Sequence, residues 1–129
     1  MSHPRLAVFA RQANGQVAPL RVLEGQKTGI IRSLHGIYVD IPNDEVVIAD
    51  RGLVQEFQYD TPGFLAVWNR TDSGNVAPKK LIRGPKSQLT SPRSVYVDPK
   101  NGEYGAGDTN SHSIMVFPRD FPTGPKPSG

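Results

Sequence analysis

The sequence contains no cysteine, and this absence excludes several kinds of structure. Without cysteine there is no disulfide framework, no covalent haem attachment and no thiolate metal site. The cellular compartment stays open, because exported proteins can also lack cysteine. The missing residue therefore limits the chemistry of the chain without limiting its location.

Long apolar runs are missing as well. Nothing approaches the roughly 18 consecutive apolar residues of a transmembrane helix, so we expect no membrane span. The apolar stretch in the first ten residues, MSHPRLAVFA, is too short for a secretory signal peptide. We therefore expect either a cytosolic chain or an exported one whose signal has been removed or lies outside this sequence.

The sequence also leaves little room for helices. In 129 residues there are 13 glycines and 12 prolines, and no stretch of helical length lacks one of these helix breakers. Hydrophobic residues make up 36% of the chain, which is low for a self-sufficient core. We therefore expect strands, with help from a neighbouring chain or from a segment outside this one.

Charge and motifs give little support for nucleic-acid binding or catalysis. The net charge is +3 and the pI about 9.4, but lysine and arginine occur singly or in pairs such as Lys79-Lys80. This scatter favours a solvated surface over a nucleic-acid groove. The nucleophile elbow, the Walker loop, the dinucleotide fingerprint and the zinc-protease motif are all absent, so no cofactor is predicted.

The chain repeats itself. NGQVAPLRVLEG at Asn14–Gly25 recurs as SGNVAPKKLIRG at Ser73–Gly84, 59 residues later. SLHGIYVDIPNDEVVIAD at Ser33–Asp50 recurs as SPRSVYVDPKNGEYGAGD at Ser91–Asp108, 58 residues later. A third copy begins with IMVFPR at Ile114–Arg119 and stops there. A repeat of about 50 residues is typical of a solenoid, a propeller or another modular array.

Each unit contains four short runs of strand composition, bounded by Gly, Pro, Asn or Asp. The segments DIPNDE and DPKNGE have the composition of hairpin turns. Four antiparallel strands per repeat describe a propeller blade, so the expected fold is all-β, with about two four-stranded blades as part of a larger or oligomeric β-propeller. The strands expected in unit order are Gly36–Asp40, Glu45–Ala49, Phe64–Asn69 and Lys79–Arg83.

The segments LHGIYVDIPNDEVVIAD and SPRSVYVDPKNGEYGAGDTNSHSIMVF resemble the NHL-type β-propeller repeat, in the bacterial variety that carries GNVAP links. The resemblance covers nearly everything from Leu6 to Arg119. It implies that the four strands listed above run from the innermost to the outermost of a blade. It also implies propeller blades over residues 1–121, with units of about 6–64 and 65–119, and a Pro/Gly-rich tail at 122–129.

This assignment amounts to two blades' worth of strands plus one. Because propellers close with four to eight blades, something else must complete the ring. Identical chains joined head to tail would do so, as would the rest of a longer polypeptide. We therefore expect the edge strands, Leu6–Arg11 and Ser113–Phe117, to pair with protein outside this chain. One of these two strands is surplus, since both match the third strand of a blade.

The first unit is ten residues longer than the step from Leu65 to Ile114, which places an insertion within Leu53–Phe64. The insertion carries Phe57 and Tyr59 and ends at Phe64, and Asp50-Arg51-Gly52 precedes it. Aromatic side chains on a loop can anchor a partner. Phe57, Tyr59, Phe64 and Arg51 are therefore the candidate partner-binding residues, and the alternative is that they pad an adjacent blade.

No metal site is predicted. His35, just before an inner strand, is the single candidate considered, because a His-Gly at such a place binds metal in amidating-lyase relatives of the family. The matching positions in the second unit, Arg93 and Ser94, supply no imidazole, and a metal usually needs three converging ligands. A surface or channel-lining histidine is the preferred interpretation of His35.

The residues that recur in each unit are interpreted as structural. Four aspartates end strands and are expected to accept backbone N–H bonds in the following turns. The arginine after each third strand is expected to pair with a carboxylate, and the aromatic two residues before it to be at least partly buried between blades. These sets are Asp40, Asp98, Asp50 and Asp108; Arg11, Arg70 and Arg119; and Phe9, Trp68 and Phe117.

The expected function is that of a non-catalytic β-propeller module for protein–protein interaction or assembly. The alternative is a lyase- or lactonase-like or ligand-binding propeller with a metal site in the central channel. The expected partners are proteins, either identical chains or the rest of a longer propeller. A periplasmic or extracellular location is favoured by the family resemblance alone.

Overall fold

The computed structural model describes residues 4–31, 34–55 and 58–120, and within them the chain is all-β, as predicted. The helical content of this part is two three-residue 3₁₀ turns, η1 (Gln26–Thr28) and η2 (Pro85–Ser87). The strands are β1 (Arg5–Val8), β2 (Arg21–Glu24), β3 (Leu34–Asp40), β4 (Glu45–Asp50), β5 (Leu53–Gln55), β6 (Gln58–Thr61), β7 (Phe64–Asn69), β8 (Lys80–Ile82), β9 (Pro92–Asp98), β10 (Glu103–Asp108) and β11 (Ser113–Pro118).

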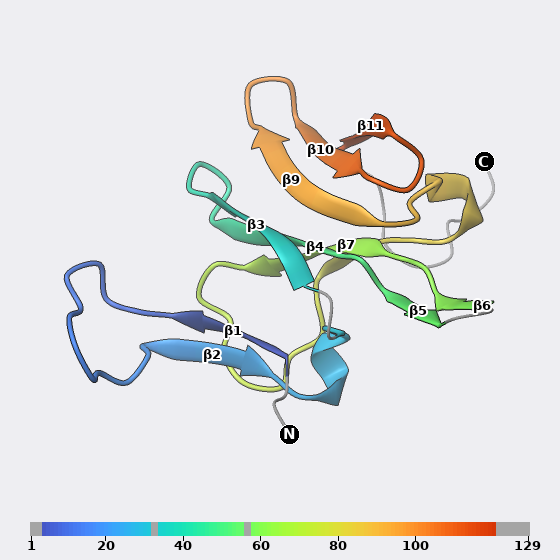
Figure 1. The fold of residues 1–129 in the computed structure, drawn as a ribbon. Helices are drawn as coiled ribbons and strands as arrows, with labels where there is room; N and C mark the ends of the chain where they lie inside the picture. The colour runs from blue at the N-terminus through green and yellow to red at the C-terminus, as the bar shows by residue number, and fades with distance from the viewer. Residues whose placement is uncertain (1–3, 32–33, 56–57, 121–129) are drawn as a thin grey trace.

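The centre of the molecule is a four-stranded antiparallel sheet with the order β3-β4-β7-β8, here called the middle sheet (Figure 1). These are the four strands predicted from the repeat, in the predicted order along the chain. The strand β7 has the predicted bounds, and β3 begins two residues earlier than predicted, at Leu34. The local turn chemistry explains the agreement, because Asp and Asn residues close the β3–β4 hairpin.

Two smaller antiparallel sheets lie on either side of the middle sheet (Figure 1). The first sheet pairs β1 with β2, and the third sheet has the order β9-β10-β11. The registers repeat between units: Leu6 lies opposite Leu23 in the first sheet, as Leu65 lies opposite Ile82 in the middle sheet. The same strand types therefore pair in the same way in different copies of the repeat.

The ten-residue insertion forms a small hairpin of its own, β5 with β6. The sequence did not predict these strands. The second unit holds no copy of the segment, so neither repetition nor an Asn-Gly type of turn marked it.

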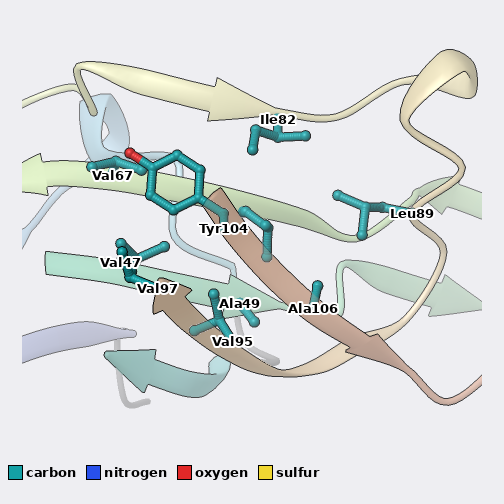
Figure 2. Close-up of a cluster of buried hydrophobic side chains, with 10 residues drawn as sticks. Val47, Ala49, Val67, Ile82, Leu89, Val95, Val97, Tyr104 and Ala106 are labelled. Atoms are coloured by element: carbon teal, nitrogen blue, oxygen red, sulfur yellow. The ribbon is translucent and has the colours of Figure 1, made fainter. Parts of the chain in front are cut away.

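The core consists of two clusters on opposite faces of the middle sheet. One packs the middle sheet against the third sheet and centres on Tyr104 and Leu65, which are fully buried; Figure 2 shows most of its side chains. The other packs the middle sheet against the first sheet around Trp68, which is also fully buried. The indole Nε1 of Trp68 donates a hydrogen bond to the carbonyl of Val76 at 2.9 Å. The middle sheet thus carries a buried cluster on each face.

Trp68, Phe117 and Phe9 do not share one environment. Trp68 is buried, as predicted, and Phe117 is half-buried against the third-sheet cluster. Phe9 is 50% exposed, so its predicted burial is wrong within this chain. Phe9 instead lines a cleft beside the first sheet.

The repeated phrase comprises a loop and the strand that follows it, β2 in the first unit and β8 in the second. It ends at a glycine, Gly25 or Gly84, from which the chain leaves for the next sheet. Both glycines have positive φ, 122° and 97°, which favours glycine. A Cβ atom on Gly25 would also collide with the side chain of Asn75. After each glycine a hydroxyl closes the same short turn: Thr28 Oγ1 and Ser87 Oγ donate to the glycine carbonyl three residues back, both at 2.6 Å.

Candidate functional site

Of the four residues predicted to bind a partner, the structure describes the side chains of two, Arg51 and Phe64. Phe57 lies outside the described residues, and Tyr59 lies in β6, which pairs with β5. Phe64 is a correction: only 1% of it is exposed, so its ring supports the core and is not offered to a partner. It begins β7 in the middle sheet, where both faces are covered. Arg51 is half-buried and its Nε donates to Ser91 Oγ at 3.0 Å, which ties the end of β4 to the start of β9.

His35 is exposed on β3. In residues 4–31, 34–55 and 58–120 no group of three or more His, Cys, Asp or Glu side chains is arranged to hold a metal ion. No helix in this part of the chain is long and apolar enough to cross a membrane.

The aspartates at the strand ends accept hydrogen bonds in the turns, as predicted. Asp40 accepts from the backbone N–H and the side-chain amide of Asn43, at 3.3 and 2.7 Å. Asp98 accepts the same two bonds from Asn101, at 3.2 and 2.7 Å. The hydrogen bonds from Asn101 lower the pKa of Asp98, because they stabilise its carboxylate form.

Asp50 and Asp108 close a longer connection. Asp50 accepts the backbone N–H groups of Ile31 at 2.8 Å and Gly52 at 2.9 Å, and Asp108 accepts those of Thr90 and Ser91 at 2.7 and 3.0 Å. Each thus fastens the end of one strand, β4 or β10, to the segment that leads into its neighbour in the same sheet, β3 or β9. Burial raises the pKa of Asp50. At Asp108 burial has the same effect, but the hydrogen bonds from Thr90 and its neighbours outweigh it and lower the pKa.

A charged cluster joins the middle and third sheets around Glu45, whose side chain is 1% exposed. Its Oε2 lies 2.7 Å from Lys79 Nζ and 3.1 Å from Arg119 Nη2, and its Oε1 accepts from the Tyr104 hydroxyl at 3.2 Å. Burial alone would raise the pKa of Glu45, but the hydrogen bond from Lys79 and the charges of Arg119 and both neighbouring lysines lower it. The cluster therefore holds an ionised carboxylate between two sheets.

The arginines that follow the third strand of each unit differ in their partners. Arg119 reaches Glu45 in the neighbouring sheet, whereas Arg70 pairs with Asp44 of its own sheet, Nε to Oδ1 at 2.6 Å. Both Arg70 and Asp44 are substantially exposed. Arg11 is exposed, and no ion pair is found for it within the described residues. The predicted carboxylate partner is thus confirmed for two of the three arginines.

An apolar cleft of about 350 Å³ lies between the first and middle sheets. Leu6, Val8 and Phe9 line one side of it, and the outward side chains of β3 and its turn line the other. We call the latter the cleft face; it consists of Ile37, Val39 and Ile41, which are 53%, 49% and 66% exposed.

A second apolar surface lies on the far side of the molecule, on the side of the third sheet that does not pack on the middle sheet. It consists of Tyr96, Ile114 and Val116, which are 43%, 75% and 51% exposed, and we call it the open face. Gly105 lies opposite both Tyr96 and Val116 in the sheet. A Cβ atom on Gly105 would collide with the Tyr96 ring, so glycine lets this ring lie flat across the strands.

The sequence did not single out the two faces, although a signal was present. Along β11 the exposed Ile114 and Val116 alternate with the half-buried Met115 and Phe117, so apolar side chains point to both sides of an edge strand. Such a pattern is typical of a strand covered on both faces.

Comparison of the chain with protein-family models, with curated proteins and with solved structures found no match. The two faces must therefore be interpreted from their own geometry.

Proposed function

We propose that the chain is a segment of a β-propeller that works as a non-catalytic protein-binding module. The middle sheet supports the blade assignment, because its antiparallel order β3-β4-β7-β8 is that of a four-stranded blade. On the same assignment the third sheet lacks its outermost strand and the first sheet lacks its two innermost strands. The incomplete sheets would be the places where protein binds.

The cleft face is the observation that carries the proposal. Ile37 and Val39 lie 58 positions before Val95 and Val97, so they are the matching residues of two repeat units. Val95 and Val97 are buried against the middle sheet, at 8% and 4% exposure, whereas Ile37 and Val39 are about half exposed. The residues that pack on a neighbouring sheet in one unit thus lack that neighbour in the other.

The free edge of β1 offers the backbone groups that a partner strand needs. The carbonyl of Val8 accepts the N–H of Leu20 on the β2 side. Because successive residues of an antiparallel strand bond to opposite sides, the N–H and C=O of Ala7 point to the other edge. Within the described residues β1 pairs with β2 alone. Addition of strands at such an edge combines backbone hydrogen bonds with side-chain burial in the cleft.

The carboxylates of the repeat have structural roles that fit a module without chemistry. Asp40 and Asp98 close hairpins, Asp50 and Asp108 fasten the connections into the sheets, and Glu45 joins two sheets. Each of these carboxylates is therefore already engaged in a contact that holds the fold together. Protein binding at the incomplete sheets is the function that the geometry supports best.

A synthetic strand pair tests this proposal. A fluorescein-labelled peptide with the sequence of residues 91–109 carries an innermost and a second strand, the types that the first sheet lacks. We expect its fluorescence anisotropy to rise saturably with the full-length chain, whereas a scrambled peptide should not respond. Ala7→Pro removes the outward N–H and should abolish binding, while Ala7→Val keeps that N–H and should preserve it. Equal signals from the two peptides would refute the proposal.

A further inference from the structure

We propose that the partner of this surface is a second copy of the same chain, joined head to tail, with the open face of one copy packed on the cleft face of the next. This inference rests on the proposed function and names its partner. It also assigns the strand exchange that makes the contact possible: β11 of one copy takes the place of β1 beside β2 of the next.

The chain already contains the contact that the two faces would make. Tyr96, Ile114 and Val116 of the open face match Tyr38, Leu65 and Val67 in the repeat, which lie on the side of the middle sheet that packs against the third sheet. Likewise, Ile37 and Val39 of the cleft face match Val95 and Val97, which lie on the opposing side of that same contact. The packing of the third sheet on the middle sheet is therefore a template for packing one copy on the next.

The charges are complementary in the same arrangement. Glu103 begins β10 as Glu45 begins β4, and Arg70 follows β7 as Arg119 follows β11. Within the chain Glu45 and Arg119 are 3.1 Å apart across two sheets. The template thus brings Glu103 of one copy to Arg70 of the next. Arg70 is available for this contact, because its present partner Asp44 is an exposed residue of its own hairpin turn.

The strands β1 and β11 both match β7 in the repeat, so both are of the type that pairs with β2. The strand exchange leaves one of them in that position. The strand β11 is the better anchored of the two: Phe117 packs on the core cluster, Arg119 binds the buried Glu45, and the carbonyl of Arg119 accepts from Lys80 Nζ at 2.6 Å. The strand β1 buries one side chain, Leu6, and its ion pair, Arg5 with Glu24, is exposed. We therefore infer that β1 is the strand displaced.

The side chains fit this direction of exchange. When β11 replaces β1, Ile114 takes the position of Leu6 and Val116 that of Val8, so the apolar volume in the cleft is kept. In the reverse exchange Ala7 would replace Met115 against the core cluster and leave a cavity. The register follows from the first sheet, where Leu6 lies opposite Leu23 and Val8 opposite Arg21. Val116 of one copy is thus expected opposite Arg21 of the next.

Cysteine cross-linking tests the register directly, because the chain has no cysteine of its own. The single variants Val116→Cys and Arg21→Cys are mixed under mild oxidation, and mass spectrometry identifies the disulfide-linked dimer. We expect this mixed dimer to form faster, by about tenfold or more, than the dimer of Val116→Cys with the control Lys86→Cys, whose position in η2 is exposed and away from both faces. Equal rates for the two mixtures would overturn the proposed register.

Sedimentation equilibrium tests whether the open face forms the contact between copies. The full-length chain should sediment as multiples of 14.1 kDa, and Ile114→Asp should raise the dissociation constant about tenfold or more. Lys86→Asp, at an exposed position in η2 away from both faces, is the control and should leave it unchanged. Ala7→Pro should also leave the dissociation constant unchanged, because β1 is displaced when two copies associate.

The outcomes separate this inference from the proposed function. A chain that stays at 14.1 kDa up to submillimolar concentration, yet still binds the peptide of residues 91–109, overturns self-assembly and leaves protein binding standing. A chain that self-associates equally well with Ile114→Asp overturns the open face as the contact. Loss of association on Ala7→Pro overturns the strand exchange.

Discussion

The hydroxyl of Tyr104 lies 3.2 Å from Oε1 of Glu45, so a residue of the third sheet bonds a carboxylate buried at the start of the middle sheet. Burial, together with the charge of Glu45, raises the pKa of Tyr104, and the phenol therefore stays a neutral donor at physiological pH. Apolar packing brings the two sheets together, and this bond with its neighbouring ion pairs sets their register.

Replacing Glu45 by Gln should destabilise the chain at neutral pH. The amide keeps the shape but removes the charge that Lys79 and Arg119 face, and we expect the free energy of unfolding to fall by about 2 kcal/mol. Because the folded pKa of Glu45 lies below its ordinary value of 4.5, the ionised form stabilises the fold above pH 4.5 and this contribution is lost as the pH falls through the folded pKa. Urea denaturation at several pH values should show the gap between variant and wild type closing below pH 4.5. A gap that is independent of pH would contradict the ion-pair role.

Trp68 should carry much of the stability of the packing between the first and middle sheets. It is fully buried and its indole N–H is bonded to Val76, so Trp68→Ala should lower the free energy of unfolding by about 3–5 kcal/mol. The matched change Phe9→Ala, at the equivalent but half-exposed position, should cost less than about 1 kcal/mol. Thermal denaturation of the two variants measures both effects, and similar losses would show that the equivalence of the positions extends to their burial.

The repeat explains how far the fold could be predicted. Strands copied in both units, such as β4 and β7, were placed within a residue, because their lengths and turn residues recur and a second copy corrects errors in the first. The β5–β6 hairpin was missed because it has no copy. Repetition thus predicts the elements that recur, but it gives no information about a segment that is inserted in one unit alone.

Burial was harder to predict than strand position, and Phe64 and Phe9 show why. Phe64 adjoins an unrepeated segment and was correctly placed at the start of a strand, but the sequence did not show that both faces of this strand are covered. Phe9 shares a sequence pattern with Trp68, yet Trp68 is fully buried between two sheets and Phe9 is half exposed. Which face of a strand is covered depends on the neighbouring sheet, and local pattern carries no record of that neighbour.

Asp50 and Asp108 occupy equivalent positions and should nevertheless respond differently to neutralisation. The pKa of Asp108 is lowered, so its charge stabilises the fold above the ordinary value of 3.8 and this contribution is lost on acidification. The pKa of Asp50 is raised, so the folded state favours its protonated form and acidification toward 3.8 adds to stability there. At neutral pH we expect Asp108→Asn to cost about 1–3 kcal/mol and Asp50→Asn clearly less. Chemical denaturation curves of the two variants measure both losses of unfolding free energy. A larger loss for Asp50→Asn would contradict the prediction that the charge of Asp108 stabilises the fold more.

The contact between Glu103 and Arg70 of neighbouring copies leads to a charge-exchange experiment. Glu103→Arg and Arg70→Glu should each weaken self-association, because each places like charges at the contact. The chain that carries both changes restores opposite charges, with the signs reversed, and its dissociation constant should return to within about threefold of the wild-type value. Lys86→Glu changes the net charge as Arg70→Glu does, at an exposed position in η2 away from both faces, and should have little effect. Sedimentation measurements on the four variants decide the matter: two single losses without rescue in the double variant would mean that Glu103 and Arg70 do not meet.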